Sequence, residues 1–123
     1  DALIVPSWAK GAYTMSNNAG VPEFVEKLLA EGKIVGMISA GDLTALTAKL
    51  PRQPLTSHPS VKSYLDNEFE YSEDPVVVSS KLVASRGPGT AFPFALTLVE
   101  MLCGVEKHAE VHAPMVFPAH TPL

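Results

Sequence analysis

The chain has 123 residues, of which 46% are hydrophobic and 18% charged, and its formal net charge is −4. This composition is that of a globular protein, long enough for a single domain over residues 1–123, and it excludes a disordered chain. No basic block is present, which argues against a nucleic acid or an anionic membrane as partner, and the apolar runs are too short to span a bilayer. The single cysteine, Cys103, excludes an internal disulfide framework and suits a reducing compartment such as the cytoplasm.

The first third of the chain alternates between strand and helix signals. Residues 2–5 form an apolar run that ends at Pro6, which predicts a buried strand. Turn-forming residues predict a loop over 7–18, and an amphipathic helix is expected over 21–31. The apolar run 34–38 predicts a second buried strand. Strand, helix and strand form a βαβ unit, so a parallel sheet with a right-handed crossover is expected.

Short elements bounded by glycine, proline and small polar residues are expected in the rest of the chain. The predicted helices cover residues 42–50, 60–65, 91–103 and 106–112. The predicted strands cover residues 55–59, 71–79, 81–85 and 113–117. The helix over 91–103 is apolar on nearly every side, so it is expected to be mostly buried, with Cys103 as a small core residue. Because the chain opens directly on a strand with no initiator methionine, we expect it to be N-terminally incomplete, with a covering layer supplied by a missing segment or a second chain.

The sharpest chemical signal lies where the strand 34–38 meets the next helix. Ser39 is followed by the small residues Ala40 and Gly41, and a helical pattern starts there. A strand that turns into a helix at a small polar residue has the form of a nucleophile elbow, in which backbone N–H groups and the helix N-terminus favour negative charge. The match to G-x-S-x-G is imperfect, because Met37 holds the first glycine position. An ordinary strand-to-helix turn remains the alternative.

Several segments in fixed order resemble a known family. They are Ile38-Ser39-Ala40-Gly41, Leu55-Thr56-Ser57-His58-Pro59-Ser60-Val61-Lys62, Tyr71-Ser72-Glu73, Ser85-Arg86-Gly87-Pro88-Gly89-Thr90 and Phe94-Ala95-Leu96. This pattern closely resembles the ThiJ/PfpI superfamily, and within it the Parkinson-disease protein deglycase (DJ-one) branch. The resemblance runs from Ala2 to Phe117.

The resemblance implies an α/β fold, a flavodoxin-like three-layer sandwich with a mainly parallel sheet, whose N-terminal strands and first helix are absent here. It implies a homodimer that acts without cofactor or metal on methylglyoxal or glycated groups, as a glutathione-independent glyoxalase or protein deglycase. A redox-stress chaperone or binding protein with a degenerate site is the alternative function.

The family site is a cysteine at the elbow, a nearby histidine and a glutamate from the first helix. By resemblance, Ser39 stands at the cysteine position and His58 matches the histidine, while the glutamate lies in the absent N-terminal part. Serine lacks the oxidation ladder of a thiol, and it needs a base to become nucleophilic. Ser39 is therefore either a weak catalytic residue, with His58 as its base, or the mark of a degenerate site, an engineered change or a sequence error.

The remaining pocket positions also depart from the family pattern. The family's Pro-Gly-Gly oxyanion loop reads Pro6-Ser7-Trp8, and the indole of Trp8 is expected to crowd the pocket. By resemblance, the pocket is formed by the residues that flank these loops and the elbow: Trp8, Ala9, Ala40 and Pro88. Asp42 replaces the usual proline, where its carboxylate would interact with the helix dipole.

Two further clusters have a functional and a structural interpretation. His108 and His112 lie one helical turn apart, a spacing that can bind a metal, but no third ligand is evident and a solvated helix face is favoured. Arg86 and Thr90 precede a helix, where they would either hold an anion or fasten the loop by capping.

Overall fold

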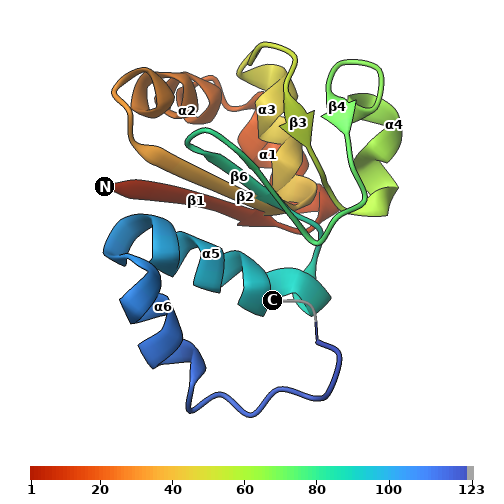
Figure 1. The fold of residues 1–123 in the computed structure, drawn as a ribbon. Coiled ribbons are helices and arrows are strands. Elements are labelled where there is room, and N and C mark those ends of the chain that lie inside the picture. Colours follow the sequence, from red (N-terminus) through yellow and green to blue (C-terminus); the bar gives the residue numbers. More distant parts are fainter. Residues whose placement is uncertain (122–123) are drawn as a thin grey trace.

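A computed structural model of the chain describes residues 1–121 (Figure 1). A four-stranded sheet crosses the molecule in the order β1-β2-β6-β5, formed by β1 (Ala2–Ser7), β2 (Ile34–Ser39), β6 (Leu82–Ser85) and β5 (Val76–Ser79). The first three strands of that order are parallel, and β5 is antiparallel to β6. A small parallel pair joins β3 (Pro54–Leu55) to β4 (Glu70–Tyr71). The predicted α/β class with a mainly parallel sheet is confirmed.

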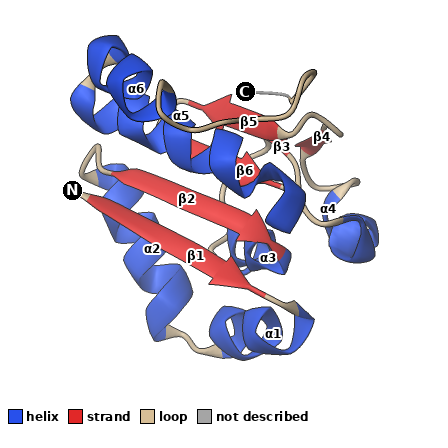
Figure 2. Ribbon diagram, turned by 90° about the horizontal axis from the view of Figure 1, so that it is seen from below, coloured by secondary structure: helices blue, strands red, loops and turns tan. Residues whose placement is uncertain are grey.

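Helices cover both faces of the sheet, which gives three layers (Figures 1 and 2). One face carries α1 (Ala9–Asn17), α2 (Gly20–Ala30) and α3 (Leu43–Thr47), and the other carries α5 (Ala91–Cys103) and α6 (Val105–His112). The short α4 (Lys62–Leu65) lies beside β4. Within residues 1–121, none of the helices has the length and apolar character needed to cross a membrane.

The central strand β2 is buried on both faces, as its continuous apolar run predicts. Val35 and Met37 belong to the larger core cluster, which lies under α1, α2 and α3. Ile34 belongs to a smaller cluster with Phe94 and Leu98 of α5. Ile38, near the carboxyl end of β2, packs against this smaller cluster too, so the strand is held from both sides close to Ser39.

The loop predicted over 7–18 is wrong, because most of it forms α1. The turn signals at Gly11 and Asn17 are overridden by packing, since Ala12 and Ser16 lie four residues apart on one helix face and are both buried. The first strand also continues past Pro6 to Ser7. Proline is accepted there because β1 is an edge strand of the described sheet, so no neighbour on the outer side needs its N–H.

Several predicted elements are shorter than expected. The helix over 42–50 is a 3-10 turn at Ala40–Asp42 followed by α3, and the helix over 60–65 is a 3-10 turn at Pro59–Val61 followed by α4. The strand over 55–59 is limited to the two residues of β3, and the strand over 71–79 is split into β4 and β5 by the turn at Asp74 and Pro75. Proline and small polar residues favour turns at these points, so the regular helix or strand is shorter than the sequence pattern predicts.

The C-terminal part differs in two respects. Residues 113–117 form a turn and irregular backbone instead of a strand, and Phe117 packs edge-on against Phe92 of α5 with ring centroids 5.4 Å apart. The bounds of α5 match the prediction, but only one of its faces is buried, because Phe92 is 57% and Leu102 47% exposed. Cys103 is exposed as well, so its predicted role as a core residue is wrong.

Gly41 is the point where the turn after β2 meets β1. A Cβ at this position would overlap the carbonyl oxygen of Val5 and lie 3.1 Å from its carbonyl carbon. Both are backbone atoms of a paired strand, which cannot rotate away as a side chain would. The absence of a side chain at Gly41 is therefore what allows the turn to pack under β1.

We expect Gly41→Ala to lower the free energy of unfolding by about 3 kcal/mol, at the upper end of typical overpacking costs. Urea denaturation measures the change. Gly89→Ala is the matched control, because a Cβ there meets no atom within 4 Å. The control should stay within about 0.5 kcal/mol of the wild-type protein. Equal effects of the two substitutions would contradict a specific role for Gly41.

Candidate functional site

Ser39, the last residue of β2, has the backbone conformation of a sharp elbow. Its dihedral angles are φ 65° and ψ −132°, a region that side-chain-bearing residues rarely occupy. A strained residue of this kind costs about 1–3 kcal/mol and persists only where the surroundings enforce it. Here β2 is paired on both sides up to the elbow, and the 3-10 turn starts immediately after it. The predicted sharp turn from strand to helix is confirmed.

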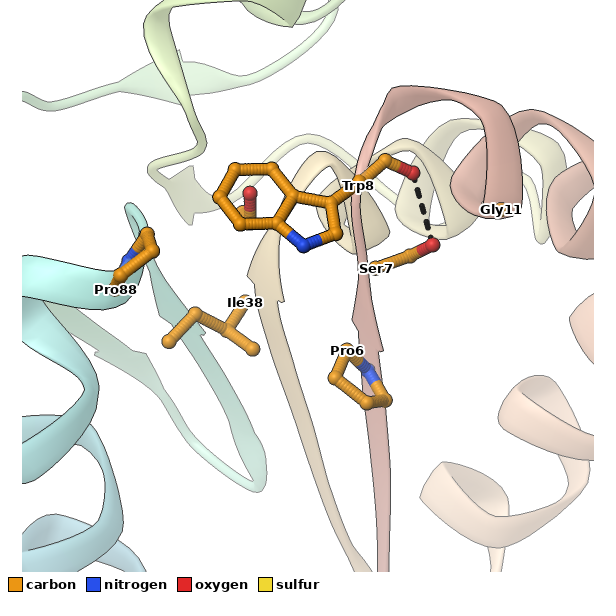
Figure 3. A pocket seen from close by; sticks show the side chains of 7 residues that line it. Pro6, Ser7, Trp8, Gly11, Ile38 and Pro88 are labelled. Atoms are coloured by element: carbon orange, nitrogen blue, oxygen red, sulfur yellow. Dashed lines mark hydrogen bonds between the residues drawn. The ribbon is translucent and has the colours of Figure 1, made fainter.

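A cavity of about 480 Å³ opens at the carboxyl ends of β1 and β2 (Figure 3). Ligand sites of parallel sheets commonly lie at this edge, where the loops that follow the strands converge. The cavity is lined by Pro6, Ser7, Trp8, Gly11, Ile38, Ser39 and Pro88. Three of the predicted site residues, Ser39, Trp8 and Pro88, are thus brought together from three separate parts of the chain.

The indole of Trp8 is part of the wall of this cavity, and the Ser39 hydroxyl oxygen is buried with no hydrogen-bond partner among the described residues, so crowding by the indole stays a prediction. The side chain extends from the end of β1 toward Pro88, and the residue is 69% exposed (Figure 3). Its backbone carbonyl accepts hydrogen bonds from the Ser7 hydroxyl at 2.9 Å and from the Ala12 N–H at 2.8 Å. The backbone of Trp8 is fixed by these bonds while its ring forms an open wall.

His58 lies next to the elbow through its backbone. Its N–H donates to the carbonyl oxygen of Ser39 at 3.2 Å. Its imidazole carbon Cδ2 lies 3.5 Å from the place that a Cβ on Gly87 would occupy, so the ring faces the residue that precedes Pro88. The side chain of His58 does not line the cavity itself.

The hydrogen bonds of His58 define its neutral tautomer. The backbone N–H of Ser60 donates to Nδ1 at 3.1 Å, and the hydroxyl of Ser60 lies 2.7 Å from the same nitrogen. A nitrogen that accepts from a backbone N–H carries no proton, so the proton of the neutral ring is on Nε2. The free nitrogen of neutral His58 is consequently a donor, whereas a base for the Ser39 hydroxyl would need a lone pair there.

Two predicted pocket residues lie elsewhere. Ala9, the first residue of α1, lines a neighbouring cavity with Tyr13 and Tyr64. Ala40 is buried at the start of the 3-10 turn and contributes no surface to the cavity at the elbow. Any contribution of Ala40 to the site comes through its backbone.

Asp42 lies in an environment that its position at the start of a helix did not predict. It is fully buried, and neither carboxyl oxygen has a hydrogen-bond partner among the described residues. This burial raises the pKa of Asp42 well above its ordinary value, because the ionised form loses its hydration. Burial therefore favours the neutral acid at Asp42, in place of the carboxylate that was expected to interact with the helix dipole. One feature of the sequence indicates this burial: Asp42 directly follows Ala40 and Gly41, two small residues that allow close packing.

The loop before α5 is fastened by its own side chains. The hydroxyl of Thr90 accepts from the backbone N–H groups of Arg86 and Gly87, both at 3.1 Å. The guanidinium Nε of Arg86 donates to the carbonyl oxygen of Ser57 at 3.0 Å. These donors are satisfied within the chain, which favours the structural interpretation of the segment over an anion site.

The two histidines of α6 have different partners. Nδ1 of His108 lies 2.5 Å from a carboxylate oxygen of Glu100 on α5, and the ring of His112 stacks on Phe117 at 5.3 Å. Glu110 pairs instead with Lys107 at 2.8 Å. Within residues 1–121, no three acidic, cysteine or histidine side chains are grouped as a metal site would require.

Comparisons with known proteins place this geometry in a family context. Residues 1–101 match the sequence profile of the DJ-1/PfpI family. The glutathione-independent glyoxalase DJ-1 of Schizosaccharomyces pombe is 38% identical over 120 residues, which are 96% of this chain and 63% of that protein. The Parkinson disease protein 7 homolog of Danio rerio is 33% identical over 94% of this chain and 63% of its own length.

Solved structures give the same result. The structure of Schizosaccharomyces pombe DJ-1 has a TM-score of 0.90 at 38% identity and is matched over 96% of this chain and 63% of its own. That of Drosophila melanogaster DJ-1beta has a TM-score of 0.87 at 32% identity, over 92% of this chain and 62% of its own. The chain thus spans slightly less than two thirds of the length of these relatives.

We expect Asp42→Asn to stabilise the protein at neutral pH. An acid with a raised folded pKa binds more protons in the folded state, so stability falls as pH rises from the ordinary carboxyl pKa of about 3.9 toward the raised value. The amide side chain of the variant cannot ionise, so the variant does not lose folding stability in this way as the pH rises. Thermal unfolding from about pH 4 to about pH 7 should show a stability gain for Asp42→Asn that grows with pH. The exposed Asp66→Asn is the control and should show no such trend; a constant difference for Asp42→Asn would contradict a neutral buried acid.

We also expect the α6 histidines not to retain zinc. Two imidazoles leave half of a tetrahedral shell to water, and Nδ1 of His108 is occupied by Glu100. After dialysis from a zinc solution, metal analysis should find well below one equivalent per chain. One retained equivalent that is lost in His112→Ala would overturn this expectation.

Proposed function

The chain belongs to the DJ-1/PfpI family, and from this membership we propose that it acts on small α-oxoaldehydes such as methylglyoxal, or on groups glycated by them, as a glutathione-independent glyoxalase or deglycase. Relatives from Schizosaccharomyces pombe and Caenorhabditis elegans carry the name glutathione-independent glyoxalase. The observation that carries the proposal is the strained elbow at Ser39, a residue that lines the cavity at the carboxyl end of the sheet and whose hydroxyl oxygen is buried without a hydrogen-bond partner among the described residues. Strain of this kind is typical of a residue that must present its side chain to a substrate.

In the proposed reaction, the hydroxyl oxygen of Ser39 adds to the aldehyde carbon. A C–O bond forms, the carbonyl electron pair moves to oxygen, and the hydroxyl proton ends on that oxygen, which gives a hemiacetal. Backbone N–H groups at an elbow are suited to the developing negative charge, and we assign this role to Ala40 and Trp8. The C1 proton then leaves while the C2 carbonyl oxygen gains a proton, which gives an enediol. Protonation at C2 with loss of the C1 hydroxyl proton forms the C1 carbonyl of an ester, and water hydrolyses the ester to the hydroxy acid and the free Ser39 hydroxyl.

We assign His58 the role of proton donor at the edge of this site, because its ring faces Gly87, the residue before the lining residue Pro88. Its Nε2–H is left free by the contacts of Nδ1 with Ser60. A donor beside the carbonyl oxygen supports addition to the aldehyde, but it does not generate an alkoxide at Ser39. Addition of the Ser39 hydroxyl to the aldehyde carbon therefore depends on the intrinsic reactivity of the aldehyde.

A binding protein that has lost the chemistry is the second candidate function. The described residues that line the cavity include no carboxylate, and the proton transfer from C1 to C2 needs a base. A serine elbow without a base can hold an aldehyde reversibly without converting it. Such a protein would serve as a stress-response chaperone or aldehyde-binding protein.

We further propose that the protein acts in the cytoplasm as a homodimer and without a cofactor. The family resemblance and the single cysteine support this setting. In the part of the chain that the structure describes, the outer edge of β1 has no strand partner, and an open edge of this kind can accept a further strand.

With the N-terminal acid supplied, we expect Ser39→Cys to raise turnover of methylglyoxal at least about tenfold, because a thiol has a few per cent thiolate near pH 7 and the helix N-terminus lowers its pKa further. Ser39→Ala should abolish turnover. The matched control is Ser63→Ala on the exposed face of α4, which should not change the rate. Lactate formation is the measurement.

Titration of the introduced thiol completes this test. A thiol pKa near the ordinary value of about 8.5, together with no lactate from Ser39→Cys, would overturn the enzymatic function. The reversible aldehyde-binding function would then be the better account.

A further inference from the structure

The cavity at the elbow is larger and more apolar than a three-carbon dicarbonyl requires. Its volume is about 480 Å³. Sites of about 300–1,000 Å³ hold ligands of drug size, whereas a water-sized group takes about 30 Å³. Methylglyoxal would leave most of this space to solvent.

The lining of the cavity excludes charged ligands. Apart from the hydroxyls of Ser7 and Ser39 and the indole N–H of Trp8, the side-chain groups around it are apolar, and none of the described lining residues is ionisable at neutral pH. A carboxylate or phosphate in this cavity would find no cationic partner, and the net charge of −4 disfavours anions further. The ligand that fits is neutral.

Trp8 gives the cavity a flat aromatic wall. Its indole extends from the end of β1 toward Pro88, and Ile38 and Pro6 line the same space (Figure 3). An indole with one side open to a cavity gains by stacking against a second planar ring. Trp8 and Ser39 line the same cavity, so a ring placed against the indole leaves a carbonyl group for the elbow.

We propose that Trp8 is a specificity-determining residue that selects neutral α-oxoaldehydes with an aromatic or similarly flat apolar group, of the arylglyoxal class, over methylglyoxal. This inference rests on the proposed function for the aldehyde chemistry at Ser39. The binding part of this proposal can be tested without turnover, because stacking on the Trp8 indole would also stabilise a bound neutral aryl ketone.

The first experiment measures binding without chemistry. Acetophenone has the aryl carbonyl group but no aldehyde, so it tests the wall alone. Ligand-detected NMR should show saturable binding to the wild-type protein, retained in Trp8→Phe and weakened about fivefold to tenfold in Trp8→Leu, as expected for the loss of an aromatic pair. Tyr13→Leu is the matched control, because Tyr13 is also 69% exposed but lines a different cavity. Equal binding to all four proteins, or none to the wild-type protein, overturns the proposal.

The second experiment separates the two proposals. The ratio of kcat/KM for phenylglyoxal to that for methylglyoxal should exceed one in the wild-type protein and fall at least about fivefold in Trp8→Leu, with rescue in Trp8→Phe. Turnover of both aldehydes with a ratio that Trp8→Leu leaves unchanged overturns the role of Trp8 and leaves the proposed function intact. Saturable, Trp8-dependent binding of acetophenone without turnover of either aldehyde supports the ligand class and overturns the enzymatic function. Circular dichroism confirms that each variant is folded.

Discussion

The contact between the turn after β2 and the end of β1 is the constraint on which the candidate site depends. Gly41 packs against the backbone of Val5, and the register of the two strands sets Ser7 opposite Ser39. Because both strands are parallel, their ends meet at one edge of the sheet and the loops that follow them converge there. The strain at Ser39 is maintained by this arrangement, since relaxing its backbone would separate the turn from β1. The site therefore depends on the pairing of β1 with β2 and not on the surface loops alone.

Burial of Asp42 follows from the same contact. A turn held under β1 has no access to water, so the carboxyl group is forced into its neutral form. The stability lost there at neutral pH is compensated by the packing of the core under α1, α2 and α3. A neutral acid also adds no negative charge beneath the elbow, where an ionised one would repel the oxyanion of an addition step.

Local signals account for much of the fold. The apolar run of β2 and the segment of α5, bounded by a glycine-rich loop and Gly104, were predicted because composition alone distinguishes them from their surroundings. Helix α1 was missed because its buried face consists of the small residues Ala12 and Ser16, which give almost no hydrophobic periodicity. The elbow was predicted from small residues after a strand, but the burial of Asp42, the exposure of Trp8 and the tautomer of His58 are tertiary effects. They depend on which segments meet in space, and no local pattern encodes that.

The position of β2 also has a consequence for how the molecule opens. Its residues from Val35 to Ile38 are paired with β1 on one side and β6 on the other, and helices cover both faces. Amide hydrogens in such a strand exchange with solvent only when a large cooperative unit opens, whereas α6, which has no fully buried residue, can fray at little cost. Partial unfolding that begins at α6 would therefore leave the elbow assembled. Hydrogen-exchange protection should rise steadily from the C-terminal helix toward the strand that carries Ser39.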